Sequence, residues 1–127
     1  MKGTRRYTAL AQLHYSKGTD ALQDREFQSV FDELTIQLED ELEDYPEDLD
    51  IENAGGILTI GFPNGSTIVV SRQIATHEIW IAARSGGFHL ANKVEGWVCG
   101  TTSETLAELV SRVVSEQLGR DVSVLGE

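Results

Sequence analysis

Carboxylates crowd the segment between Asp20 and Glu52, where fourteen Asp and Glu residues accompany a single base, Arg25. Seven of them fall within ten residues: Glu39, Asp40, Glu41, Glu43, Asp44, Glu47 and Asp48. Carboxylate oxygens are ligands for hard cations and for Fe²⁺, and a dense acidic surface also attracts Lys/Arg-rich proteins. The segment therefore indicates binding of a positively charged ligand or partner.

Helix stability alone does not favour this crowding. If the segment is helical, Glu39/Glu43 and Asp40/Asp44 are like-charge pairs at spacing four, and each pair costs a few tenths of a kcal/mol. Anions near a helix C-terminus cost about 0.3–1 kcal/mol each at low salt, because the helix dipole favours cations there. We interpret the acids as retained for binding at some expense of stability.

We predict that seven carboxylates bind metal or a basic partner. They are Glu39, Asp40, Glu43, Asp44, Glu47, Asp48 and Asp50. Side chains on one helix face diverge, so they enclose no cavity, and we expect weak, exposed binding with Kd on the order of micromolar or poorer. The alternative is a solubilising acidic face that binds no metal.

The composition narrows the class of protein. The 127 residues fit one domain, and the formal charge of −11 argues against nucleic acid, which requires clustered Lys and Arg. The single cysteine, Cys99, has no internal disulfide partner, and no apolar run approaches the length of a membrane span. These features predict an intracellular protein that contacts neither nucleic acid nor membrane.

Residues 1–22 differ in charge from the rest of the chain. Lys2, Arg5, Arg6 and Lys17 lie in residues 1–19 without any acid. This composition suits a mitochondrial transit segment, although a cloning remnant or a disordered tail has the same character. We therefore separate a basic leader or tail, residues 1–22, from a folded domain, residues 23–127.

Apolar spacing predicts two helices. Apolar residues recur at helical spacing from Phe27, which indicates a helix from about Asp24 to Tyr45, because Pro46 disfavours helical geometry before it. The segment Thr101-Thr102-Ser103-Glu104 resembles a capping box that opens a second helix, which we expect Gly119 to end.

Short alternating segments between these helices predict an antiparallel meander. We expect strands near residues 49–53, 57–62, 66–70, 77–83, 87–90 and 96–99, bounded by turn residues such as Asn64-Gly65 and Ser85-Gly86-Gly87. Two amphipathic helices and one half-solvated sheet favour an α+β two-layer sandwich, with both helices packed on one face of the sheet.

Within this order of elements, several motifs resemble the frataxin family, in its bacterial or mitochondrial form. The motifs are Gly55-Gly56-Ile57-Leu58-Thr59-Ile60, Asn64-Gly65-Ser66, Arg72-Gln73, Ile79-Trp80-Ile81-Ala82 and Gly86-Gly87-Phe88-His89. The resemblance spans about residues 24–119 and includes the acidic first helix and Trp97. Ser71 and Ala91 depart from the residues that many relatives carry there, Asn and Asp. Gly-Gly-Phe-His is similar to the bacterial form.

The resemblance implies an iron-binding regulator of iron–sulfur cluster assembly. Such a protein binds iron weakly through its acids, docks on the cysteine desulfurase and scaffold complex, and modulates its rate. The implied compartment is the mitochondrial matrix or, alternatively, the bacterial cytoplasm. The rivals are a weak ferroxidase that stores iron by oligomerising, although we otherwise expect a monomer, and an acidic interaction module without metal.

Strand alternation supplies a second candidate surface. If Ile79 and Ile81 point toward the helices, Trp80 points to the solvated face, near Arg72 or Gln73 on the adjacent strand. Trp and Arg are enriched at interface hot spots, so we predict that Arg72, Gln73 and Trp80 contact the partner. A tryptophan that merely covers the sheet is the alternative.

The remaining reactive residues form no recognisable catalytic motif. His14, His77 and His89 lack the spacing of a zinc or iron site, although His89 could add one nitrogen ligand on the sheet. We predict that Cys99 is a buried, inert thiol, and we assign no catalytic residue.

Overall fold

The computed structural model describes the backbone of residues 17–126 and the side chains of residues 23–126. Helix α2 spans Lys17–Glu43 and helix α3 spans Leu106–Leu118. Between them lie β1 (Asp50–Ala54), β2 (Ile57–Gly61), β3 (Thr67–Gln73), β4 (Glu78–Ala83), β5 (Gly86–Lys93) and β6 (Gly96–Cys99). Most of the predicted basic leader, residues 1–16, lies outside the described residues.

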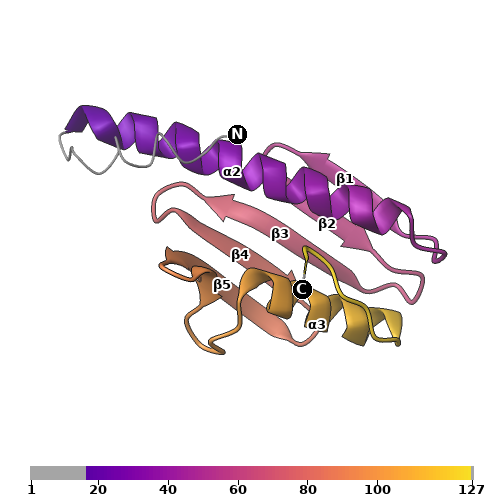
Figure 1. The fold of residues 1–127 in the computed structure, drawn as a ribbon. Helices are drawn as coiled ribbons and strands as arrows, with labels where there is room; N and C mark the ends of the chain where they lie inside the picture. The colour runs from indigo at the N-terminus through magenta and orange to yellow at the C-terminus, as the bar shows by residue number, and fades with distance from the viewer. Residues whose placement is uncertain (1–16, 127) are drawn as a thin grey trace.

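The six strands form one antiparallel sheet in the order β1-β2-β3-β4-β5-β6. Each strand therefore pairs with its neighbours in sequence, which is the predicted meander. Both helices lie on one face of this sheet (Figure 1). The predicted α+β two-layer sandwich is confirmed.

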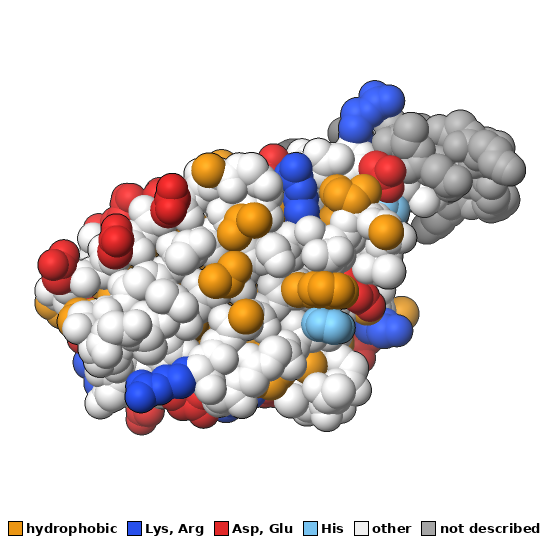
Figure 2. Space-filling model, turned by 180° about the vertical axis from the view of Figure 1, so that it is seen from behind, with side chains coloured by type: hydrophobic (Ala, Val, Ile, Leu, Met, Phe, Trp, Pro, Cys, Tyr) orange, Lys and Arg blue, Asp and Glu red, His pale blue; other side chains and the backbone are white. Residues whose placement is uncertain are grey.

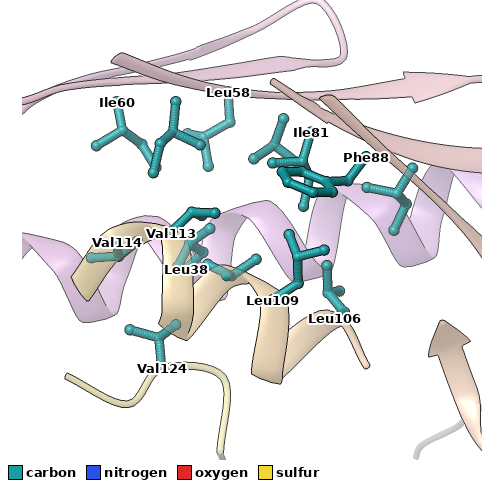
Figure 3. Close-up of a cluster of buried hydrophobic side chains, with 14 of the residues drawn as sticks. Leu38, Leu58, Ile60, Ile81, Phe88, Leu106, Leu109, Val113, Val114 and Val124 are labelled. Carbon is teal, nitrogen blue, oxygen red and sulfur yellow. The ribbon is translucent and has the colours of Figure 1, made fainter. Parts of the chain in front are cut away.

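The hydrophobic core lies between the helices and the sheet. Alternate residues of β2, β3 and β4 point inward, and Leu58, Ile60, Ile68, Ile79 and Ile81 are almost fully buried. They meet the apolar stripes of both helices and Val124 from the C-terminal tail (Figure 3). Strand alternation consequently sends the intervening residues to the opposite face, which neither α2 nor α3 covers (Figure 1).

The first helix differs from its prediction at both ends. It begins at Lys17, seven residues before the predicted Asp24, where the apolar pattern carried no signal. It ends at Glu43, after which the amides of Asp44 and Tyr45 donate to the carbonyls of Glu41 and Leu42 in a tight last turn. The α-helix therefore ends before the predicted Tyr45, because the turn that precedes Pro46 is no longer α-helical.

The predicted capping box at Thr101–Glu104 is wrong. The amide of Cys99 donates to the carbonyl of Glu104, and Val98 pairs with Thr105, so the intervening loop cannot be helical. The box forms instead between Thr105 and Glu108, whose backbone and side chains bond reciprocally. Gly119 ends the helix in a left-handed conformation, as predicted.

The segment after α3 folds back against both helices. Ser111 and Ser115 on α3 each bond backbone groups of the tail, at Val124 and Val122. On the other side, the amide of Leu125 donates to a carboxylate oxygen of Glu41 on α2 (2.9 Å). The tail therefore ties the two helices together.

Candidate functional site

The seven predicted metal-binding acids line one margin of the molecule, and we call them the acidic ridge. Glu39, Asp40 and Glu43 lie on the last turns of α2, Asp44, Glu47 and Asp48 lie in the loop that follows, and Asp50 opens β1. From behind, acidic side chains gather along one edge of the uncovered sheet face (Figure 2). The ridge thus continues from helix to strand, as the sequence suggested.

Two members of the ridge have structural partners. Arg120, in the C-terminal segment after α3, forms a bidentate pair with Glu47. Its Nε and Nη2 atoms lie 2.6 Å and 2.9 Å from the carboxylate oxygens. These hydrogen bonds lower the pKa of Glu47. The side-chain amide of Asn53 donates to Glu39 (3.3 Å). Asp40, Glu43, Asp44, Asp48 and Asp50 form no ion pair within the described residues.

The ridge side chains do not converge. Within residues 23–126, no group of three or more His, Cys, Asp or Glu side chains is arranged to hold a metal ion. Carboxylates that share a surface without a common centre suit a hydrated, loosely held cation or an array of Lys and Arg side chains.

The uncovered sheet face is organised around Trp80. Register places Trp80 opposite Ser71 on β3 and opposite His89 on β5. The indole and imidazole rings stack, with centroids 4.1 Å apart and planes inclined by 8°. The predicted outward direction of Trp80 is confirmed, because its neighbours Ile79 and Ile81 are buried in the core.

Glu78 orients the tryptophan. Trp80 Nε1 donates to Glu78 Oε1 (2.9 Å), and this bond is the main cause that holds the pKa of Glu78 below its ordinary value. Thr76 donates a second bond to the same oxygen (3.2 Å). The ring is therefore fixed by a stacking partner on one side and a charged acceptor at its N–H edge.

Small and apolar side chains surround this stack. Register and alternation place Thr59, Val69, Ala82 and Gly87 in one row across the face, next to the row of Ile57, Ser71, Trp80 and His89. Figure 2 shows hydrophobic side chains in the middle of the face and acidic side chains at its margin. A surface of small and apolar side chains with a fixed aromatic group suits docking of a macromolecule.

Arg72 and Gln73 lie on opposite faces of β3. Gln73 pairs with Glu78 and shares the uncovered face with Trp80. Arg72 pairs with Ile79, and its side chain extends from the face that the helices cover. Arg72 Nη1 lies 3.5 Å from Asp32 on α2, and its guanidinium packs where a Cβ at Gly56 would be. The structure therefore brings Gln73 to Trp80 but separates Arg72 from it.

His77, Trp97 and Cys99, which the sequence analysis also considered, contact residues of the folded domain. The His77 ring contacts Asp24 and Phe27, and Phe27 also packs against half-buried Trp97. Cys99 is buried; burial raises the pKa of its thiol, but hydrogen bonds from Thr101 and Thr102 outweigh this and lower the pKa to about 7. His77 therefore contacts a carboxylate and an aromatic ring, and the Cys99 thiol contacts a hydroxyl group.

Glu78 and Arg120 were not among the residues predicted from the sequence, and His89 was considered only as a single nitrogen ligand. His89 and Trp80 are equidistant from the turn between Ala83 and Gly86, so the register of this hairpin would have paired them. Alternation from Trp80 would likewise have placed Glu78 on its face. Arg120 lies 73 residues from Glu47, and no local pattern signals that contact.

Comparisons with known proteins agree with this architecture. A family model of the frataxin-like domain matches residues 20–120. An iron–sulfur cluster assembly protein CyaY from Azotobacter vinelandii is 39% identical over 104 residues, covering 80% of this chain and 94% of the relative. A solved frataxin from Psychromonas ingrahamii superposes with a TM-score of 0.70 at 25% identity, covering 78% of this chain and 94% of that one.

The fold and the two surfaces define a frataxin-like α+β domain with an acidic helix margin and an open sheet face. The chain belongs to the frataxin family. None of the helices that the structure describes combines the length and apolar character needed to cross a membrane.

Proposed function

We propose that this protein is an iron-binding regulator of iron–sulfur cluster assembly, which docks on the cysteine desulfurase and scaffold complex. The family membership and the name of the Azotobacter relative support this role. The observation that carries it is the juxtaposition of an acidic ridge, mostly without bases of its own, and an open sheet face with a fixed, partly exposed tryptophan.

The two surfaces have different roles in this proposal. The acidic ridge attracts basic partner surface over long range and holds Fe²⁺ weakly, so its contribution falls as salt rises. The open face supplies the short-range contact through Trp80 and Gln73. Arg72, which pairs with Asp32, contributes at the margin of the helix layer rather than beside Trp80.

Iron fits the ridge as a cargo ion rather than as a resident cofactor. Fe²⁺ accepts carboxylate oxygens with water completing its shell, and Asp40, Glu43 and Asp44 offer such oxygens on one surface. Because these ligands diverge, the bound ion exchanges readily and is available for transfer. The A. vinelandii relative is bacterial, so we infer the bacterial cytoplasm as the compartment in preference to the mitochondrial matrix.

The deciding experiment measures desulfurase turnover and cluster formation on the scaffold with and without this protein. A change in either rate that weakens in high salt and in a Trp80→Ala variant supports the proposal. No change in either rate contradicts it. Oxygen consumption on adding Fe²⁺ to the isolated protein distinguishes a ferroxidase, and the absence of any response to Fe²⁺ distinguishes a metal-free interaction module.

A further inference from the structure

Strand β1 forms one margin of the sheet and adjoins the acidic ridge. It pairs with β2 on one side, and no strand of the described residues pairs with its other side. Four of its five residues are exposed, and Ile51 is half-buried. The outer edge of β1 is therefore within reach of another extended chain.

The hydrogen-bond register identifies which backbone groups of β1 point outward. The amide of Arg72 donates to the carbonyl of Gly56 (3.2 Å), so residues 56, 58 and 60 direct their backbone groups toward β3. Residues 57, 59 and 61 then face β1, where their partners are Ala54, Glu52 and Asp50. By alternation, the N–H and C=O groups of Ile51 and Asn53 face away from the sheet.

The side chains of β1 determine which chain can pair there. Asp50 and Glu52 lie on the uncovered face, and Ile51 points toward the helix layer. Acidic residues on an edge strand repel a second copy of the same edge, because like charges opposite one another are destabilising. The same residues favour a strand that places Lys or Arg opposite them.

We propose that β1 accepts an extended basic segment of a partner protein as a seventh strand of the sheet. The segment bonds the outward groups of Ile51 and Asn53 and places Lys or Arg opposite Asp50 and Glu52, with an apolar residue opposite Ile51. This inference rests on the proposed function, since it specifies how the acidic margin engages a partner. It differs from simple charge attraction because backbone bonds fix the register.

The probe is a capped peptide of alternating residues, Lys-Val-Lys-Val-Lys-Val-Lys, titrated into the full chain at low salt. We expect hydrogen exchange of the Ile51 and Asn53 amides to slow by about tenfold, whereas the amide of Glu52, already bonded to β2, changes little. A block peptide with the same composition, Lys-Lys-Lys-Lys-Val-Val-Val, controls for charge. An alternating peptide N-methylated along one edge controls for backbone pairing.

The protein variants distinguish the contribution of backbone hydrogen bonds to peptide binding from the contribution of charge. Ile51→Pro removes an outward N–H, which an edge strand tolerates, and should weaken peptide binding about tenfold relative to Ile51→Ala, which keeps the N–H. Glu52→Lys should weaken it by a similar factor, with backbone chemical shifts verifying that each variant is folded. If Ile51→Pro perturbs β1 itself, the N-methylated peptide still tests pairing on the unaltered protein.

Equal binding of the alternating, block and N-methylated peptides, or unchanged exchange of Ile51 and Asn53, overturns strand addition. If strand addition fails while the protein still alters cluster assembly, the proposed function stands without it. If the peptide adds to β1 but the assembly rates never change, strand addition stands and the proposed function fails.

Discussion

Trp80 and His89 stack face to face across the β4–β5 pair, with ring centroids 4.1 Å apart. The contact lies on the uncovered face, so it fixes the orientation of the indole without burying it in the core. Glu78 holds the other edge of the ring through a 2.9 Å hydrogen bond. The Trp80 ring is therefore already ordered before a partner docks on this face, which reduces the conformational entropy lost on binding.

Trp80→Ala should separate binding from stability. The ring lies outside the core, so we expect a small change in melting temperature, whereas loss of a hot-spot aromatic commonly costs about 2 kcal/mol of binding, roughly thirtyfold in Kd. Melting temperature measured beside affinity for the desulfurase–scaffold complex tests this. Val69→Ala, on the same face, serves as a matched control that leaves the aromatic stack intact.

A large fall in the melting temperature of Trp80→Ala would show that the ring contributes to the core. Unchanged affinity with unchanged stability would instead remove the open face from the functional surface and leave the acidic ridge alone.

Fe²⁺ should perturb the backbone NMR signals of residues 39–52 and leave those of residues 103–118 unaffected. The reason is that carboxylates gather along the end of α2 and the start of β1, whereas the acids of residues 103–118 are fewer and partly paired with Arg112. Zn²⁺ and Ca²⁺ titrations measure the expected lack of selectivity. Shifts centred on His77 or His89 would contradict binding at the ridge.

Neutralising Glu43 and Asp44 to Gln and Asn should leave the protein equally stable or more stable. Both are exposed, lie at the C-terminal end of α2 and form no ion pair within residues 23–126, so each substitution removes an unfavourable charge. Glu47→Gln is the matched control and should destabilise, because it breaks the bidentate pair with Arg120. Urea denaturation measures both.

A loss of more than about 1 kcal/mol in the Glu43/Asp44 variant would reveal structural contacts of these acids. A destabilised Glu47→Gln beside an unchanged double variant would show that the ridge contains both structural and binding carboxylates.

The sequence predicted the ridge and the direction of Trp80 because both depend on local patterns. Acid density is visible in the residue types, and outward direction follows from alternation beside buried Ile79 and Ile81. The predicted capping box at Thr101–Glu104 was wrong because the Cys99 amide donates to the Glu104 carbonyl. This hydrogen bond holds the segment in a loop, so the helix begins later in the chain. Alternation left open whether Arg72 or Gln73 lies near Trp80, and the register places Gln73 there because adjacent residues on a strand face opposite sides.

The contacts of the C-terminal segment with α2 and the loop after it could not be predicted, because they join residues far apart in the sequence. Pairs such as Arg120–Glu47 and Leu125–Glu41 join residues more than 70 positions apart, and nothing in either local sequence specifies them. They arise because packing of the two helices brings the tail beside the end of α2.

Gln117→Leu should destabilise the protein by about 2 kcal/mol. The side chain is 3% exposed; its oxygen accepts from the amide of Arg84, and its nitrogen donates to Ser66 Oγ and the carbonyl of Thr67. Leucine would leave buried polar groups without partners, and each such group costs about 1–3 kcal/mol. Urea denaturation beside exposed Gln37→Leu as a control measures the difference, and equal stability of the two variants would contradict it.

The pair between Glu104 and Arg112 should make part of the stability depend on pH. Arg112 donates to both oxygens of Glu104, at 2.8 and 3.0 Å, and these bonds are the main cause that lowers the pKa of Glu104. A carboxylate whose pKa is lower in the folded state contributes stability above its unfolded pKa and loses it as pH falls through the folded value.

Glu104→Gln should therefore cost about 1 kcal/mol at pH 7, and the difference from the unaltered protein should shrink as pH falls below about 4. Urea denaturation of both proteins at pH 7 and pH 3 measures it. Glu108→Gln distinguishes the ion pair from the helix cap, because Glu108 bonds the Thr105 amide and forms no ion pair within residues 23–126. A difference for Glu104→Gln that is the same at both pH values would show that the carboxylate contributes through packing rather than through its charge.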